Sequence, residues 1–157
     1  MTGRYQEYPE YKESGVDWLE SIPTHWGVKP LKHQSSCNDD VINEKTDPDH
    51  EIEYVDIGSV SAVDGISKAE KMVFGNAPSR ARRKVQDGDV IVSTVRTYLE
   101  AIAPISTPPQ NMLVSTGFAV IRPNSNFDKE FASYCLRARG FIEEVVTRSV
   151  GVSYPAI

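Results

Sequence analysis

The stretch Gly88-Asp89-Val90-Ile91-Val92-Ser93-Thr94-Val95-Arg96 decides how this chain is expected to fold. Its first two residues belong to an Asp-Gly turn signal at 86–89. The run over 90–95 is rich in β-branched side chains, which pack well on a pleated sheet. The sequence therefore predicts a strand over 90–95 that begins at a turn and passes into a loop at Arg96.

Other strand signals lie on both sides of this run. Residues 53–57 alternate between polar and apolar side chains, and 63–66 contain an Asp-Gly pair typical of a hairpin turn. Residues 101–105 and 117–121 are two more short apolar runs, each with a proline within it or close by. Short strands at this density predict a twisted, mostly antiparallel sheet or a partial β-barrel, with a β-rich core at 50–123.

Helical spacing follows the strands, within a segment at 125–150. A Ser-x-x-Asp signal at 125–128 predicts the start of a helix, and Gly140 divides the apolar pattern into two stripes. The fold class expected from this order is α+β, with C-terminal helices packed on one side of the sheet. The first stripe is Phe131, Tyr134, Cys135 and Ala138, and the second is Phe141, Ile142, Val145 and Val146.

The first thirty residues are expected to form an N-terminal arm. One short helical turn is predicted to begin near Ser14 and to end at Pro23. Trp18, Ile22 and Trp26 are spaced by four, so one face of this segment is expected to pack on a core.

The chain has 157 residues, which is the length of one domain. Apolar residues make up 39% and charged residues 25%, as in a folded protein rather than a disordered tail. No apolar run approaches the roughly 20 residues that span a bilayer. Two cysteines are too few for a disulfide framework, so the expected location is the reduced cytoplasm.

The formal net charge is −5, but the charges are unevenly distributed. Residues 1–70 carry 6 Lys and Arg against 15 Asp and Glu, a balance of −9. Residues 71–157 carry 11 against 7, a balance of +4. Because fields act over a Debye length of about 8 Å, a basic half can attract nucleic acid even on an acidic chain. A chance partition of the charges is the alternative.

Catalytic motifs are not visible in the sequence. The histidines and cysteines lack the spacing of a zinc site, and no glycine-rich phosphate-binding loop or nucleophile elbow occurs. The Glu-x-Lys of a magnesium nuclease occurs only at Glu10-Tyr11-Lys12, with no aspartate before it. Asp39-Asp40 lies in a polar loop, where carboxylates are usually solvated. The sequence predicts no catalytic residue, no metal and no cofactor.

Basic and hydroxyl side chains gather in short segments of the basic half. Arginine suits phosphate and guanine because its planar fork donates two parallel hydrogen bonds. Hydroxyl groups beside the arginines add donors for phosphates and base edges. These segments indicate a nucleic-acid-binding surface, and a solvated charged face is the alternative. The candidate residues are Arg80, Arg82, Arg83, Lys84, Ser93, Thr94, Arg96, Thr97, Tyr98, Ser115, Thr116, Arg148, Ser149 and Ser153.

Several segments resemble the specificity subunits of type I restriction–modification systems, in the same order along the chain. They are 8–19 (YPEYKESGVDWL), 22–26 (IPTHW), 54–60 (YVDIGSV), 88–96 (GDVIVSTVR), 115–123 (STGFAVIRP) and 151–157 (GVSYPAI). The resemblance implies a single target recognition domain over 1–157, the N-terminal one of two in such a subunit. The chain is then expected to stop before the helical spacer of a longer protein.

The resemblance implies that the domain reads one half of a split double-stranded DNA target. Methylation subunits and a restriction subunit are the implied partners, and they carry the catalysis. The residues expected to anchor phosphates are Arg80, Arg82, Arg83 and Lys84. Those expected to read base edges are Arg96, Thr97, Tyr98, Ser115 and Thr116, with further contacts from Arg148, Ser149 and Ser153.

Two alternatives to this interpretation stay open. Arg96 could pair only with Glu100, four residues on, and Ser93-Thr94 could be ordinary strand residues. The chain could also be a protein-interaction or self-association module with a basic face, since Tyr and Trp are enriched at interfaces. The aromatic residues of the arm that support this second alternative are Tyr5, Tyr8, Tyr11 and Trp18.

Overall fold

The computed structural model describes residues 5–157, and the chain forms two compact units, Met1–Leu31 and Lys32–Ile157. The first four residues of the expected arm lie outside the described residues. Within the described part of the chain, no helix has both the length and the apolar character needed to cross a membrane.

The first unit contains a small hairpin. Its strands β1 (Tyr11–Glu13) and β2 (Ser21–Pro23) pair antiparallel. Gly15 and Glu20, in the connection, have φ values of 76° and 52°, and such left-handed residues help the chain to reverse. A single turn is present, since the backbone N–H of Leu19 donates to the carbonyl of Val16 at 3.0 Å, but its expected end at Pro23 is wrong because Pro23 ends a strand.

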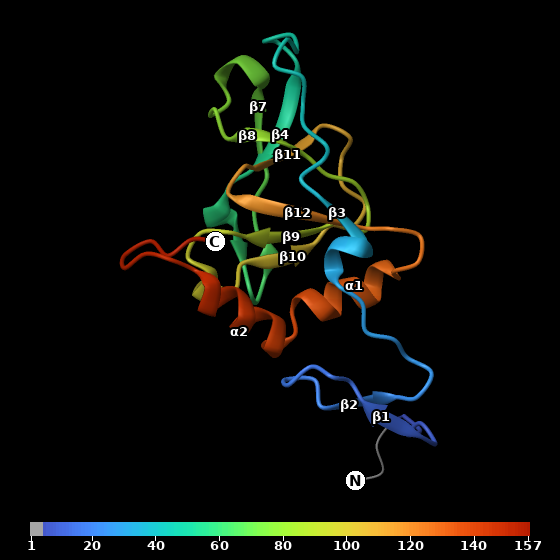
Figure 1. The fold of residues 1–157 in the computed structure, drawn as a ribbon. Coiled ribbons are helices and arrows are strands. Elements are labelled where there is room, and N and C mark those ends of the chain that lie inside the picture. Colours follow the sequence, from blue (N-terminus) through green and yellow to red (C-terminus); the bar gives the residue numbers. More distant parts are fainter. Residues whose placement is uncertain (1–4) are drawn as a thin grey trace. The chain divides into compact units, whose positions relative to one another are not determined.

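The decisive run forms β9 (Val90–Ser93), a buried strand inside a four-stranded sheet. The strand order is β10-β9-β12-β3, and all neighbours are antiparallel (Figure 1). The strands expected around and after the decisive run are confirmed. The other strands of this first sheet are β10 (Ile102–Pro104), β12 (Phe118–Pro123) and β3 (Ser35–Cys37).

A second four-stranded sheet has the order β7-β4-β11-β8. Its members are β7 (Glu70–Val73), β4 (Glu51–Val55), β11 (Met112–Ser115) and β8 (Ala81–Lys84). β11 runs parallel to β4, whereas the other two pairs are antiparallel. The expected Asp-Gly hairpin is also present, as β5 (Val60–Ser61) and β6 (Gly65–Ile66). The α+β, mostly antiparallel prediction is confirmed, and neither sheet closes on itself.

Side chains from both sheets meet in one buried core. Val55 of β4 and Val114 of β11 pack in the same cluster as Ile91 of β9 and Phe118 of β12. All four side chains are fully buried. The two sheets are therefore joined by apolar packing, which is the main stabilising force in a domain of this size.

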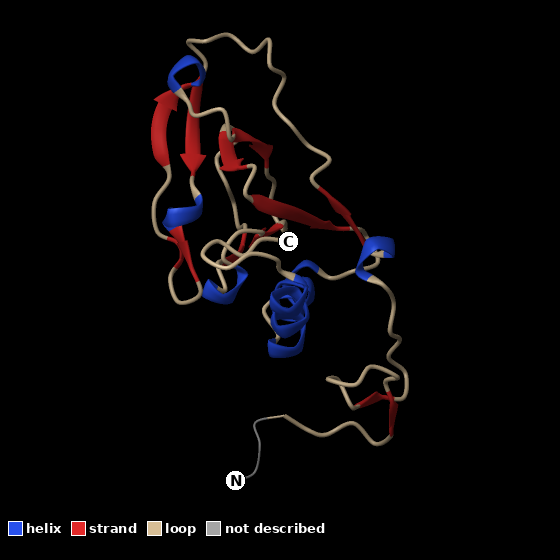
Figure 2. Cartoon of the chain, turned by 60° about the vertical axis from the view of Figure 1, so that its left-hand side comes forward, coloured by secondary structure: helices blue, strands red, loops and turns tan. Residues whose placement is uncertain are grey.

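Two helices follow the strands, α1 (Lys129–Leu136) and α2 (Arg139–Arg148). Figure 2 shows both on the same side of the first sheet, as expected. Asp128 caps α1, because its Oδ1 accepts a hydrogen bond of 2.8 Å from the backbone N–H of Phe131. The helix therefore begins after Asp128 and not at Ser125. Short 3₁₀ helices occur at Leu31–His33 (η1), Ile57–Ser59 (η2), Phe74–Asn76 (η3) and Thr97–Leu99 (η4).

The apolar stripes predicted for these helices are only partly right. Phe131 and Tyr134 are exposed, and Ile142 is the buried residue of the second stripe. α1 packs against β9 and β10 through a neighbouring face that carries two small side chains and one leucine. The large apolar residues of the predicted stripe, Phe131 and Tyr134, therefore lie on the exposed side of α1 and not on its buried side. The buried residues of α1 are Ala132, Ser133 and Leu136.

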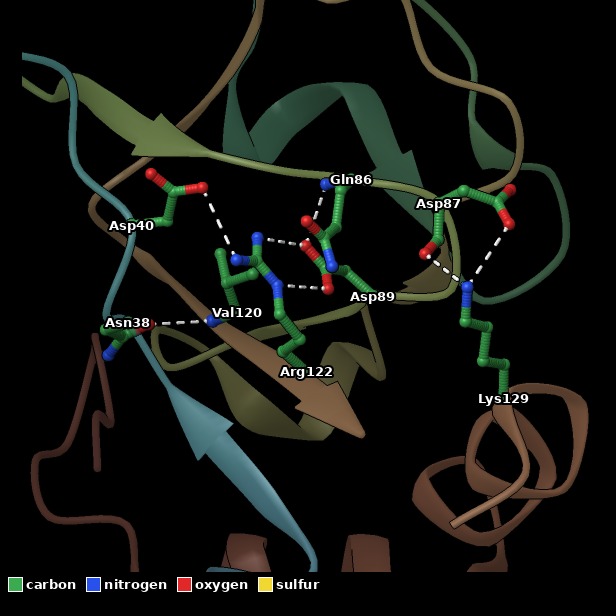
Figure 3. Close-up of polar contacts among 8 residues, drawn as sticks. All are labelled: Asn38, Asp40, Gln86, Asp87, Asp89, Val120, Arg122 and Lys129. Atoms are coloured by element: carbon green, nitrogen blue, oxygen red, sulfur yellow. Dashed lines mark hydrogen bonds and ion pairs between the residues drawn. The ribbon is translucent and has the colours of Figure 1, made fainter. Parts of the chain in front are cut away.

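A buried ion pair joins β12 to the turn before β9 (Figure 3). Asp89 is fully buried, and Arg122 donates from Nε and Nη2 to its two carboxylate oxygens at 2.9 Å each. The backbone N–H of Gln86 also donates to Asp89, at 2.8 Å. Arg122 Nη1 lies 3.4 Å from an oxygen of Asp40. Hydrogen bonding to Asp89 raises the pKa of Arg122, so the guanidinium stays charged beside the buried carboxyl group.

Replacing Arg122 with methionine is expected to lower the free energy of unfolding by about 3–5 kcal/mol, because it leaves the buried Asp89 carboxylate unpaired. Urea unfolding followed by circular dichroism measures the loss. Lys129→Met is the matched control, since Lys129 and Asp87 form an ion pair in which both side chains are more than half exposed. It is expected to cost less than about 1 kcal/mol. Equal losses in the two variants would contradict the role assigned to Arg122.

Candidate nucleic-acid interface

The cations expected to anchor phosphates do not form one patch. Successive side chains of a strand point to opposite faces, and β8 separates its basic residues in this way. The Arg82 guanidinium lies 5.0 Å from the ring centre of Phe74. Lys84 Nζ lies 4.0 Å from a carboxylate oxygen of Asp40, in a partly exposed ion pair. Arg82 and Lys84 therefore already have partners within the fold.

Arg80 and Arg83 lie beside the turn that joins β11 to β12. The backbone N–H of Thr116 donates to the carbonyl of Arg80 at 2.9 Å. Arg83 Nη2 donates to the carbonyl of Thr116 at 3.3 Å. Arg80 is exposed, and Arg83 is half-buried. These contacts bring the basic segment and the 115–117 turn together.

Ser115 lies inside this turn and not on its surface. It is fully buried, and its Oγ accepts a hydrogen bond of 3.1 Å from the backbone N–H of Gly117. The nearby Tyr54 hydroxyl donates to Asp56 at 3.1 Å, and burial raises the pKa of Tyr54. A Cβ on Gly117 would lie 2.1 Å from Cδ1 of Ile57, so any larger residue here would have to displace the Ile57 side chain.

The loop that leaves β9 is bonded to the same turn. The backbone N–H and the hydroxyl of Thr94 both donate to the carbonyl of Gly117, at 2.9 and 2.8 Å. The Ser93 hydroxyl donates to the carbonyl of Val95 at 2.7 Å. Arg96 follows with φ 48°, a left-handed conformation that is uncommon for a residue other than glycine. Arg96 is the N-cap of η4, and Glu100, its C-cap, has the same left-handed conformation with φ 56°.

The C-terminal residues complete this surface. Thr97 and Ser149 share a hydroxyl–hydroxyl hydrogen bond of 2.6 Å. The backbone N–H of Arg96 donates to the carbonyl of Pro155 at 2.7 Å, and that of Ile157 donates to the carbonyl of Thr94 at 3.0 Å. Figure 1 shows the C-terminus beside the end of β9. We call the joined segments 80–83, 94–98, 115–117 and 149–157 the rim.

Ion pairing separates the cations of the basic half into two groups. Of its 11 Lys and Arg residues, six form ion pairs. Those without a carboxylate partner, all within the described residues, are Arg80, Arg82, Arg83, Arg96 and Arg137. The first four belong to the rim. Arg80, Arg83 and Arg96 therefore bring to the rim charges that have no carboxylate partner among the described residues.

Arg96 does not form the alternative pair with Glu100. Glu100 instead accepts a hydrogen bond of 2.6 Å from Arg139 at the start of α2. The Arg96 guanidinium carbon lies 4.2 Å from the ring centre of Tyr154. Arg148, also a candidate, is paired with Glu144 on its own helix.

Exposure divides the remaining candidates. Ser93, Thr97 and Ser115 are buried, so they shape the rim without presenting a hydroxyl at its surface. Thr94 and Ser149 are half-buried, and both hydroxyls bond within the fold. The candidates exposed at the rim are Tyr98, Thr116 and Ser153.

Tyr154 is the rim residue that was missing from the candidate set. Tyr154 follows Ser153 in a polar segment and is exposed in the structure. The sequence feature that could have identified it is an aromatic residue in a short loop between Gly151 and Pro155.

Residues 5–157 contain no group of three His, Cys, Asp or Glu side chains able to hold a metal ion. Cys37 and Cys135 are free thiols, and partial burial raises the pKa of each. A raised pKa keeps a thiol protonated and less reactive.

No protein-family model and no curated protein matches this chain. Solved structures do match it. One, from work on complex assembly and conformational transition of the type I R-M system, has a TM-score of 0.71 and 32% identity over 81% of this chain. Another, the HsdS subunit from Thermoanaerobacter tengcongensis, has a TM-score of 0.68 and 31% identity over 85% of this chain.

Similar fold and similar sequence therefore coincide over most of the described residues. This chain is a domain of the HsdS family of type I specificity subunits. The HsdS-family domain covers 33% and 36% of the length of the two solved chains.

Ser115 and Thr116 are neighbouring hydroxyl residues of this HsdS-family domain, one buried and one exposed, so their alanine variants test which hydroxyl stabilises the 115–117 turn. Ser115→Ala removes a buried acceptor and is expected to lower the free energy of unfolding by about 1–3 kcal/mol. Thr116→Ala changes an exposed side chain and is expected to stay within about 0.5 kcal/mol of the parent. Urea unfolding of both variants measures the difference, and a larger loss for Thr116→Ala would overturn the assignment.

Proposed function

We propose that this HsdS-family domain binds double-stranded DNA and reads one half of a bipartite target sequence. The observation that carries the proposal is that Arg80, Arg83 and Arg96, none of which has an ion-pair partner among the described residues, lie on one hydrogen-bonded rim. Unpaired arginines can exchange water for phosphate oxygens or guanine edges without first breaking an internal ion pair.

Two kinds of contact are assigned within the rim. Arg80 and Arg83 flank Thr116 and are the proposed phosphate anchors, which set the register of the duplex. Arg96 and Tyr98 lie at and after the exit of β9, where a loop can enter a groove, and they are the proposed base readers. Lys84 faces Asp40, so its contribution to phosphate binding is expected to be smaller than that of Arg80.

The domain is proposed to be non-catalytic and to act in the cytoplasm as the N-terminal recognition domain of a longer subunit. One solved relative comes from work on assembly of the type I R-M system. By analogy, methylation subunits and a restriction subunit are the proposed partners, and they would act at the site that the recognition domain selects. No cofactor is proposed for the domain itself.

A protein-interaction module is the second candidate function. Exposed aromatic side chains in the first unit favour it, among them Tyr5 at 88% and Trp18 at 43% exposure. In the face predicted to pack on a core, Ile22 is buried, whereas Trp18 and Trp26 remain partly exposed. DNA binding by arginines weakens steeply with salt, whereas an interface built on aromatic burial does not.

The experiment that tests the proposal is a low-salt selection of this chain on randomised duplex DNA. Enrichment of a short fixed motif supports sequence-specific recognition. Arg96→Ala is expected to cost about 1–3 kcal/mol of discrimination at one base pair of that motif. Failure to bind any duplex, together with capture of a methylation subunit that is insensitive to salt, would favour the interaction module.

Arg80→Ala is expected to weaken binding to all sequences alike and to reduce the slope of log affinity against log salt by about one unit, because one phosphate contact is lost. Fluorescence anisotropy over a series of salt concentrations measures this slope. Lys71→Ala is the control, because Lys71 lies on β7 and faces Glu53 at 4.0 Å. An equal change of slope in the control would contradict a role specific to Arg80.

A further inference from the structure

Arg96 is held unlike any other arginine of the rim. Its guanidinium carbon lies 4.2 Å from the ring centre of Tyr154, a closer approach than that of Arg82 to Phe74 at 5.0 Å. Within residues 5–157 the guanidinium makes no hydrogen bond and no ion pair. One face of the group is therefore covered, while its N–H donors remain available at the edge.

The backbone around this stack is tied down on both sides. Val95 pairs with Ala156, and the backbone N–H of Arg96 donates to the carbonyl of Pro155, next to Tyr154. Val150 pairs with Ala156 in turn, so residues 150–156 fold back as a closed loop. Arg96 and Tyr154 are thus presented from two backbones that are hydrogen-bonded to each other.

Gly151 allows this loop to close. Its φ is 127°, and a Cβ at this position would lie 3.0 Å from the carbonyl oxygen of Tyr154. The left-handed φ of 48° at Arg96 is similarly uncommon. Such conformations persist where the surrounding contacts over-determine them, and they often accompany functional groups. The loop therefore holds Tyr154 at a defined position against Arg96.

We propose that Tyr154 is a positioning residue for DNA reading, whose ring fixes the Arg96 guanidinium so that its free edge donates two hydrogen bonds to a guanine in the major groove. This inference rests on the proposed function and adds the residue that sets the orientation of Arg96. The two acceptors on guanine match the spacing of the arginine fork. A fixed guanidinium loses less conformational entropy on binding than a free one, so the stack increases discrimination as well as affinity.

The test is the selection on randomised duplex DNA, repeated with variants at Tyr154 in the 157-residue chain. Tyr154→Ala is expected to broaden the motif at the same base pair as Arg96→Ala, with a loss of about tenfold or more in discrimination. Tyr154→Phe keeps the ring and is expected to retain the motif. The double variant is expected to lose no more than Arg96→Ala alone, because the two residues act as one unit.

Tyr134 provides a matched control, because it is another exposed tyrosine whose ring lies against an arginine. On α1, the Arg137 guanidinium lies 5.3 Å from the ring centre of Tyr134, which is 61% exposed, against 64% for Tyr154. Tyr134→Ala is expected to leave the selected motif unchanged. Broadening by Tyr134→Ala at the same base pair, or by Tyr154→Phe as much as by Tyr154→Ala, would overturn the positioning role.

A measurement without DNA separates failure of this inference from failure of the proposed function. Ring currents from Tyr154 are expected to shift the Arg96 side-chain protons upfield, and Tyr154→Ala abolishes the shift whereas Tyr154→Phe retains it. If the parent chain selects a motif that Tyr154→Ala also selects unchanged, the inference fails and the proposed function stands. If the parent selects no motif, the proposed function fails, and the inference falls with it even where the ring-current shift is present.

Discussion

The buried ion pair between Asp89 and Arg122 is the interaction on which the arrangement of the rim depends. A fully buried carboxylate is tolerated only with compensating charge and hydrogen bonds, and Asp89 receives both from Arg122 and Gln86. Next to this pair, Val90 lies opposite Ile121, and at the far end of the ladder Ser93 lies opposite Phe118. A slip of one residue would exchange the two faces of β9, so the ion pair at one end fixes which residues emerge at the other.

The rim itself is assembled mainly by backbone hydrogen bonds. Thr116 bonds to the carbonyl of Arg80, Thr94 bonds to that of Gly117, and Ile157 bonds to that of Thr94. Each bond joins segments far apart in the sequence. Main-chain groups hold most of these loops, with one added bond from the Arg83 side chain, and the side chains of Arg80 and Arg96 make no hydrogen bond to the described residues. This division allows a surface to change its exposed residues while its framework stays in place.

The charge distribution follows the same division. A chain of net charge −5 presents unpaired arginines because its acidic residues neutralise other cations. Glu100 pairs with Arg139, and Asp87 pairs with Lys129. Arg80 and Arg96 have no such carboxylate partner among the described residues. Local fields, and not the net charge, therefore govern what this surface attracts.

Local signals in the sequence were enough to predict the strand over the decisive run, the Asp-Gly hairpin and the α+β class, because β-branched runs and turn residues act over a few neighbouring positions. The order of the segments shared with type I specificity subunits was also visible in the sequence alone. The partner of Arg96, in contrast, depends on how distant segments pack together. Spacing by four predicts contact within an α-helix, but a 3₁₀ turn with a left-handed residue at each end separates Arg96 from Glu100. Tyr154 takes its place because backbone bonds bring residues 94–96 and 155–157 together, and no local pattern encodes a contact between segments so far apart.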